Sequence, residues 1–462
     1  MIVIDKSAKN LLGIRASIKI SDLNHNGEGV GRLENLVIFV PGALPGEEVE
    51  VEVESHHKKF FRSKLTSIIF KSPDRVTPPC PYFYNCGGCQ LQHLAYPGQL
   101  IWKESQVKAA LIRIGKLKLP VLPTVGMNKP FHYRNKAVIH LAIEGDKIKA
   151  GFYKHKSRQI IEIDDCLIQH PHNMLALKAI RHALAEALTR KEKDHQILLD
   201  IYEAELRCSF ATGQVLITLG LRGKAGDLVF GEDLIKSISN SMGDKLAGLI
   251  IKTGSNQDPH YHTLKGNPFI EELIEPFSYR ISPRSFFQVN SLQAKELFEL
   301  ATRYAGSPRT AFDLYCGTGN FALYLSGTAA EVIGIDSEAE AINDARENAA
   351  INGISNIKFM QMPIEEAKNA LEHGERPITV ILDPPRGGCS SSLLVTISEM
   401  KPERIVYISC NPATLARDLG LLQQNGFQAI KAQPIDMFPQ TSHIETVVLL
   451  QKQQDINALV MD

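Results

Sequence analysis

The sequence lacks the features that place a protein in a membrane or outside the cell. No apolar run approaches the roughly 20 residues that a membrane-spanning helix needs. The first residues, MIVIDKSAKN, do not show the charged stretch followed by an apolar one that a secretory signal would have. Net charge is also missing, because 51 Lys and Arg side chains balance 51 Asp and Glu side chains. These absences predict a cytoplasmic protein without a membrane partner, and the charge balance counts mildly against a nucleic-acid ligand.

Cysteine is present in a pattern that requires an explanation. The chain has eight cysteines, and in a reducing compartment clustered cysteines indicate metal binding or catalysis more often than disulfides. Three follow the spacing C-x5-C-x2-C and a fourth lies far along the chain: Cys80, Cys86, Cys89 and Cys166. Four thiolates suit either zinc or an iron–sulfur cluster, and the spacing leaves both open. The C-x3-C-x2-C pattern of radical adenosylmethionine enzymes is absent.

The chain is too long, at 462 residues, for one ordinary core, so a multidomain protein is expected. Residues 1–70 alternate polar and apolar side chains between glycine-rich turns, which predicts a small β-barrel. The proline-rich stretch SPDRVTPPCP at 72–81 marks a boundary. Residues 75–285 mix strand-like runs with helical segments and predict a central α+β domain that carries the cysteine cluster. Its helical stretch at 98–118 can pack on the domain that follows.

Residues 286–462 show a different pattern, in which apolar runs alternate with segments compatible with helices. The runs are TAFDLY, EVIGID, ITVILD and RIVYIS, and a loop follows each of them. Alternation of this kind predicts parallel strands with crossover helices, which is a doubly wound, Rossmann-like α/β domain.

The first of these runs leads directly into Cys316-Gly317-Thr318-Gly319-Asn320, where glycines allow the backbone to approach a ligand. Asp336 ends the next run, and an acid there can accept hydrogen bonds from the two ribose hydroxyls of an adenosine-type cofactor. A nicotinamide dinucleotide fits the same logic, but its usual third glycine is missing, because Phe321 and Ala322 follow. These residues favour S-adenosylmethionine, which carries no pyrophosphate.

Three further candidates for chemistry lie at the ends of predicted strands. Asp383 follows ITVIL, Cys410 follows RIVYI, and Glu445 precedes the run TVVLL. A cysteine on a loop between polar neighbours is expected to be a nucleophile rather than core filling. His443 is a weaker candidate at the same edge. Small buried fillers are predicted at three other cysteines: Cys208, Cys316 and Cys389.

Several ordered motifs together carry a family resemblance. They are HNGEGVGR, FVPGALPGE, CPYFYNCGGCQLQH, HYRNK, SPRSFFQVN, DLYCGTGNF, LDPPRGG, SCNP and SHIETV. The sequence resembles the RNA uridine C5-methyltransferase family, which includes bacterial 23S ribosomal RNA enzymes and tRNA T-loop enzymes. The resemblance implies that the N-terminal barrel is a TRAM domain, which is an RNA-binding fold of the oligonucleotide-binding type.

The resemblance also implies a role for each matched residue. Cys410 would be the nucleophile that adds to carbon 6 of the uracil, and Glu445 would be the base that removes the proton from carbon 5. The four clustered cysteines would hold a four-iron, four-sulfur cluster, and 23S ribosomal RNA is the preferred substrate, with the tRNA T-loop as the alternative. The pockets for adenosylmethionine and uracil would be lined by Gln288, Tyr315, Asn320, Asp336 and Asp383.

Other interpretations stay open at this stage. A nicotinamide-dependent oxidoreductase would leave Cys410 and Glu445 without roles, and a non-catalytic iron–sulfur RNA-binding protein would need only the barrel and the cysteines. An amino-group methylase would have an aromatic side chain in place of Arg386. The runs Ser55–Lys64 and Lys147–Arg158 interleave cations with aromatic side chains, as RNA-contacting surfaces do, although such runs are usually solvated faces. No feature indicates an obligate protein partner.

Overall fold

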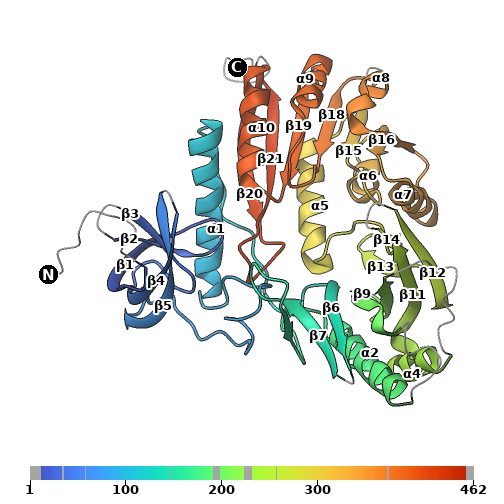
Figure 1. Ribbon diagram of the computed structural model, residues 1–462. Coiled ribbons are helices and arrows are strands. Elements are labelled where there is room, and N and C mark those ends of the chain that lie inside the picture. Colours follow the sequence, from blue (N-terminus) through green and yellow to red (C-terminus); the bar gives the residue numbers. More distant parts are fainter. Residues whose placement is uncertain are drawn as a thin grey trace.

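The computed structural model describes residues 12–453, apart from 34–35, 58, 146, 191–197, 223–231, 256–257 and 372–373. A small barrel, a central sheet and a C-terminal sheet make up the molecule, and one long helix runs between the barrel and the C-terminal sheet (Figure 1). The outer ends of the first and last predicted domains, residues 1–11 and 454–462, lie outside the described residues. Among the described residues, no helix is long and apolar enough to cross a membrane.

The barrel is closed by five strands in the order β1-β2-β3-β5-β4. Side chains alternate between the two faces of β4, as the sequence predicts. Val49, Val51 and Val53 point into the barrel core, while Glu48 and Glu50 lie on the outer face. The predicted N-terminal β-barrel is therefore confirmed. Its strands are β1 (Arg15–Leu23), β2 (Gly29–Leu33), β3 (Leu36–Val40), β4 (Glu48–His57) and β5 (Phe60–Phe70).

The central part is a seven-stranded sheet in the order β12-β11-β10-β9-β6-β7-β8, and two helices cover it. The apolar run MLALKAIRHALAEAL lies within α2, whose buried stripe packs against the sheet. The strands are β6 (Lys136–Glu144), β7 (Lys147–Tyr153), β8 (Ile160–Glu162), β9 (Ile201–Cys208), β10 (Val215–Leu221), β11 (Leu246–Gly254) and β12 (Pro259–Gly266). The helices are α2 (Pro171–Arg190), α4 (Glu232–Met242) and the 3-10 turn η4 (Gly243–Lys245).

The C-terminal sheet has seven strands in the order β17-β16-β15-β18-β19-β21-β20, with helices on both faces. The five strands from β15 to β19 are parallel, whereas β21 runs antiparallel to both of its neighbours. The predicted Rossmann-like domain is thereby confirmed. The strands are β15 (Thr310–Leu314), β16 (Glu331–Asp336), β17 (Ile357–Gln361), β18 (Ile378–Leu382), β19 (Arg404–Ser409), β20 (Phe427–Ile435) and β21 (Glu445–Lys452). The helices are α5 (Ser291–Ala305), α6 (Asn320–Ser326), α7 (Ala339–Ile351), η5 (Ile364–Glu366), α8 (Lys368–Leu371), α9 (Ser391–Met400) and α10 (Pro412–Gln424).

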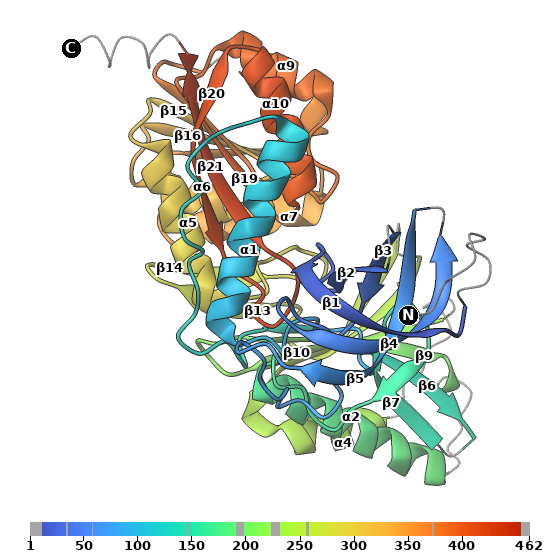
Figure 2. The ribbon, with the colours of Figure 1, turned by 90° about the vertical axis from the view of Figure 1, so that its left-hand side faces the viewer.

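Two segments that precede this sheet in the chain pack on it. Helix α1 (Tyr96–Ala110) continues into a π-turn, η2 (Leu111–Gly115), and Val107 and Leu111 share a hydrophobic core with α10. Figure 1 shows α1 between the barrel on one side and β20 and α10 on the other, and Figure 2 shows α1 lying in front of the C-terminal sheet. The hairpin of β13 (Ile270–Ile274) and β14 (Phe277–Ile281) shares its core with α5. We therefore propose that the last domain also includes this hairpin, which the sequence assigns to the central domain.

Candidate active site

The predicted chemical groups meet at one edge of the C-terminal sheet. In parallel strands the carboxyl ends lie at the same edge, which brings Asp383 after β18 next to Cys410 after β19. Glu445 reaches this edge for a different reason, because it begins the antiparallel strand β21. Ser409 of β19 pairs with Thr446 of β21, so Cys410 and Glu445 are adjacent across the two strands.

Cys410 lies on a short turn between β19 and α10. Pro412 occupies the first turn of α10, and the Asn411 side chain caps the helix by accepting the Ala413 amide at 3.1 Å. The thiol is half-buried. Burial and then the Glu445 carboxyl raise the pKa of Cys410 to about 11, whereas the Arg386 guanidinium lowers it. The thiol is therefore protonated near neutral pH, and it must lose a proton before it can act as a nucleophile.

Glu445 is almost fully buried, at 4% exposure, and among the described residues its Oε1 has no hydrogen-bond partner. Burial and then the nearby Asp383 carboxyl raise the pKa of Glu445 well above its ordinary value. Burial also raises the pKa of Asp383. Two buried carboxyl groups with raised pKa values at a strand edge are typical of a site that moves protons.

Arg386 and His443 complete this group, and sequence reasoning had treated Arg386 only as a motif residue and His443 as a weak candidate. The Arg386 guanidinium lies 3.1 Å from Nδ1 of His443, and its carbonyl accepts the Asn411 side-chain amide at 3.1 Å. Burial and then Arg386 lower the pKa of His443 to about 4, so the imidazole is neutral. Arg386 is thus the cation beside Cys410, and the LDPPRGG loop supplies it.

A cavity of about 810 Å³ opens in front of Cys410, between the barrel, α1 and the edge of the C-terminal sheet that carries Cys410. A second cavity of about 400 Å³ lies beside the four clustered cysteines, and Arg386 and His443 line both. The residues of the first cavity that carry polar side chains include Asn24, His25, Asn26, Ser105, Gln106, Arg113, Asn411 and Ser442. This cavity is large enough to admit a nucleotide-sized group to the thiol.

The glycine loop after β15 forms a cradle next to β16. Gly317 has a φ of +52°, and a Cβ there would meet only the Phe286 carbonyl at 3.9 Å, which leaves open space for a ligand. Gly319 has a φ of +83° and is the N-cap residue of α6. Asp336 at the end of β16 accepts the Gly317 amide at 2.9 Å and lies beside the cradle. Such a cradle without a third glycine fits the adenosyl group of S-adenosylmethionine.

The other predicted pocket residues surround this cradle at different depths. Asn320 is buried at the first turn of α6, and Gln288 is buried in the loop before α5, where its carbonyl accepts the Asn135 side-chain amide at 2.9 Å. Tyr315 adopts a φ of +66° directly after β15, a conformation that non-glycine residues rarely adopt. Asp313 was missed by the sequence analysis, although burial raises its pKa to about 8 and it accepts the Ala322 amide at 2.9 Å.

The four clustered cysteines line the 400 Å³ cavity together. Burial raises the pKa of all four thiols, and neighbouring thiols add to the effect at Cys89. The Gly88 amide donates to Sγ of Cys86 at 3.4 Å. The basic run at 147–158 lies alongside, since the Gly87 amide donates to the Tyr153 carbonyl at 3.0 Å. The other three cysteines predicted as fillers are buried, as expected: Cys208, Cys316 and Cys389.

One other group could hold a metal ion by donor type. Among the described residues, only His170, His172 and Cys208 bring three His, Cys or carboxylate donor atoms within 4.8 Å of one another. His170 Nδ1 accepts the His172 amide at 3.1 Å and lies 3.0 Å from Sγ of Cys208, so hydrogen bonds within the protein already account for this contact. The four clustered cysteines do not meet this criterion, because no three of their sulfurs all lie within 4.8 Å of one another.

Comparison with known proteins places these features in context. A family model described as tRNA (Uracil-5-)-methyltransferase matches residues 95–453, and a TRAM domain model matches residues 11–66. An uncharacterized RNA methyltransferase of Halalkalibacterium halodurans is 38% identical over 94% of this chain and 96% of its own length. One from Caldanaerobacter subterraneus is 37% identical over 96% of this chain and 99% of its own.

A solved structure extends the similarity to three dimensions. The tRNA (uracil-54, C5)-methyltransferase of Pyrococcus abyssi, in complex with S-adenosyl-L-homocysteine, is 29% identical to this chain with a TM-score of 0.73. The alignment covers 95% of this chain and 100% of that structure. The barrel, the central sheet and the C-terminal sheet therefore occur together in a protein that binds the demethylated form of the methyl donor.

Proposed function

The chain belongs to the tRNA (uracil-5-)-methyltransferase family and is an S-adenosylmethionine-dependent RNA methyltransferase, and from this premise we propose that it methylates carbon 5 of a uridine through a covalent bond to Cys410. The observation that carries the proposal is the juxtaposition of Cys410 and Glu445 across the Ser409–Thr446 pair. A non-catalytic RNA-binding protein would not need a thiol beside a buried carboxyl with a free oxygen atom.

The chemistry explains why a thiol and a carboxylate are both needed. Carbon 5 of uracil is a weak nucleophile, and addition of the Cys410 thiolate to carbon 6 converts the ring into an enolate. The electron pair of the enolate at carbon 5 would then form the new bond to the methyl group, while the bond between that methyl group and the sulfonium sulfur breaks, its electrons stay on the sulfur and S-adenosylhomocysteine leaves. Glu445 in its carboxylate form next removes the proton that remains on carbon 5. The electrons of that C–H bond restore the double bond between carbons 5 and 6, and the Cys410 thiolate leaves.

Each step draws on a feature of the site. The Arg386 cation lowers the pKa of the Cys410 thiol and favours the thiolate that adds to the base. The free Oε1 of Glu445 lies in a buried setting, where a carboxylate is a stronger base than in water. Bound S-adenosylmethionine supplies the electrophilic methyl group at the glycine cradle. We assign its adenosyl and amino-acid parts, together with the uracil, to the residues named by the resemblance: Gln288, Tyr315, Asn320, Asp336 and Asp383.

We propose 23S ribosomal RNA as the substrate, because the resemblance associates a TRAM barrel combined with four cysteines with the ribosomal branch of the family. The cavity in front of Cys410 supports RNA entry from the barrel side, since the turn at 22–26 lines it together with α1. The target uridine must leave its base stack to reach a thiol in such a cavity. A T-loop uridine in tRNA is the second candidate, and the similarity to the Pyrococcus abyssi enzyme favours it.

Methylation assays with separated RNAs test the substrate. We expect the protein to transfer methyl groups from S-adenosylmethionine to unmodified 23S ribosomal RNA at least about tenfold faster than to unmodified tRNA, a ratio that corresponds to about 1.4 kcal/mol of discrimination in the transition state. Nucleoside mass spectrometry of the product should identify 5-methyluridine. Preferred methylation of tRNA would move the assignment to the T-loop, and a methyl group on any other atom would contradict the proposed chemistry.

We further propose that Cys80, Cys86, Cys89 and Cys166 hold a four-iron, four-sulfur cluster. All four thiols face one cavity, and the amide of Gly88 donates to a sulfur, as backbone amides do around such clusters. Zinc bound by four thiolates would require sulfurs about 3.8 Å apart, given a zinc–sulfur bond of about 2.3 Å. No three of the four sulfurs all lie within 4.8 Å of one another, which is compatible with the larger cluster.

Replacement of Cys89 by serine is expected to remove the cluster, because the thiolate is one of four ligands in a largely buried site. Protein purified without oxygen should lose its brown colour and fall from about four iron atoms per chain to less than about one. Iron and zinc analysis of the purified protein measures this directly. Cys389→Ser is the matched control and should keep its iron, since Cys389 is buried away from the cavity. Stoichiometric zinc with no iron in the wild-type protein would contradict the assignment.

A further inference from the structure

A largely buried loop, residues 436–444, leads along the chain into Glu445 and contains no helix or strand. Buried backbone groups need hydrogen-bond partners, and an irregular loop cannot supply all of them itself. Here distant segments provide them. The Tyr133 hydroxyl donates to the Pro439 carbonyl at 3.0 Å, and the Asp436 amide donates to the Val125 carbonyl at 2.8 Å. The path of the 436–444 loop is therefore set by residues far away in the sequence.

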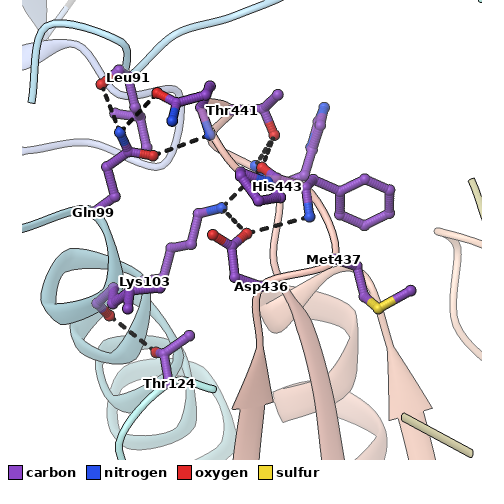
Figure 3. Close-up of polar contacts among 12 residues, drawn as sticks. Leu91, Gln99, Lys103, Thr124, Asp436, Met437, Thr441 and His443 are labelled. Atoms are coloured by element: carbon purple, nitrogen blue, oxygen red, sulfur yellow. Dashed lines mark hydrogen bonds and ion pairs between the residues drawn. The ribbon is translucent and has the colours of Figure 1, made fainter. Parts of the chain in front are cut away.

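Lys103 of α1 contacts the start of this loop directly. Its ammonium group is fully buried and lies 2.5 Å from Oδ1 of Asp436, which is also fully buried (Figure 3). The same ammonium donates to the Phe438 carbonyl at 3.0 Å, and the Tyr96 hydroxyl donates to Oδ2 of Asp436 at 3.0 Å. Burial lowers the pKa of Lys103, and the Asp436 carboxylate raises it. A buried ion pair carries a desolvation cost, so the geometry that it imposes on the loop is its main effect.

Gln99, one helical turn before Lys103, fixes the middle of the same loop. Its side-chain amide donates to Oε1 of Gln440 at 3.0 Å, and its oxygen accepts the Gln440 amide at 3.0 Å. Gln440 has a φ of +69°, which a residue with a side chain rarely adopts without such support. The Gln440 carbonyl accepts two more amides, from Gln90 and Leu91, which directly follow Cys89 in the chain. Residues 90–91, which follow the clustered cysteines, and Gln99 of α1 thus bind the same turn of the loop.

We propose that Lys103 and Gln99 are positioning residues for Glu445, which they hold in place through the 436–444 loop. The inference rests on the proposed role of Glu445 as the base. It also predicts which step depends on these residues. Cys410 is held by the β19–α10 turn, whose side-chain hydrogen bonds come from Ser409, Asn411 and Thr414. Helix α1 shares a core with α10 through Val107, one turn away from Lys103, so the Lys103 contacts do not support this turn directly. Loss of the α1 contacts should therefore displace the base more than the nucleophile.

Single-turnover reactions of the full chain with its substrate RNA separate the two steps. Formation and resolution of the covalent protein–RNA adduct are followed on denaturing gels. For Lys103→Met we expect adduct resolution to slow by about 10- to 100-fold, because small displacements of a catalytic group have effects of this size, while adduct formation stays within about threefold of the wild-type rate. Lys108→Met is the matched control on the same helix, since the Lys108 side chain is 48% exposed and pairs with Glu104 on the surface of α1.

The single variant leaves the Asp436 carboxylate buried without its cation, and it can fail to fold for that reason. The double variant Lys103→Met/Asp436→Leu replaces the pair with apolar groups of similar size and decides the question in that case. A folded double variant that accumulates adduct supports the proposal. Wild-type resolution in a folded variant, or equal slowing of both steps, would overturn it. Failure of the base assignment itself would be seen separately, as normal adduct resolution in Glu445→Gln.

Discussion

Cys410→Ala is expected to abolish methyl transfer, with a loss of at least about 10⁴-fold, because no other group can add to carbon 6 of the uracil. The variant should still bind S-adenosylmethionine and RNA, since Cys410 contributes a small, half-buried side chain to the fold. Transfer of tritiated methyl groups to RNA measures the rate, and equilibrium binding measures the two ligands. Loss of activity without loss of binding would identify the step that fails as the chemistry.

Cys208→Ala provides the matched control, because it also removes a buried thiol but lies in the central sheet, far from the catalytic edge. It should retain methyl transfer within about threefold of the wild-type rate, as expected for a site outside the catalytic group. Substantial methyl transfer by Cys410→Ala would exclude the covalent mechanism, whatever the behaviour of the control.

Glu445→Gln is expected to trap the reaction after methyl transfer. Glutamine has almost the same size as glutamate, but it cannot take the proton from carbon 5, so the bond from Cys410 to carbon 6 cannot break. Turnover should fall by about 10²- to 10⁴-fold, the range of general-base contributions, and a protein–RNA adduct should accumulate. A denaturing gel detects the adduct, and nucleoside analysis of the trapped RNA should show the methyl group already in place.

Two controls make this result specific. Glu445→Gln/Cys410→Ala should give no adduct, and Glu399→Gln, a change at an exposed ion pair between α8 and α9, should turn over normally. In the wild-type enzyme, adduct resolution should become faster as the pH rises. The sign follows from the raised pKa of Glu445, because the carboxylate that acts as the base is the form that gains population with pH. Resolution that slows with rising pH would contradict the role of Glu445 as a base.

Much of this architecture can be read from the sequence, and the reasons are local. The alternation of Val49, Val51 and Val53 with glutamates specifies a strand with one buried face. Apolar runs followed by loops specify the parallel strands of the C-terminal sheet. Gly317 and Gly319 indicate a cradle, since their positive φ values need glycine. In each case the signal lies within a few residues, where backbone conformation and burial depend directly on side-chain type.

The group around the thiol could be predicted only in part. Motif resemblance identified Cys410 and Glu445, but not the reason why they meet, which is the antiparallel direction of β21 beside β19. Asp313 carries no distinguishing sequence signal, because an acid in a strand is usually structural, and the LDPPRGG motif marks Arg386 without indicating which group it contacts. Burial makes Asp313 a candidate, because it raises the pKa of that carboxyl, and proximity to the Cys410 thiol makes Arg386 one.

The sequence by itself determined the strands, the glycine cradle and the candidates for nucleophile and base, because these depend on side-chain chemistry and on near neighbours. The tertiary structure alone decided that Lys103 lies against Asp436, 333 residues away. It also decided that α1 and residues 90–91 bind the loop that leads to Glu445. No local pattern encodes such a contact, since both residues are ordinary surface types until packing removes their water and pairs the two opposite charges in the interior.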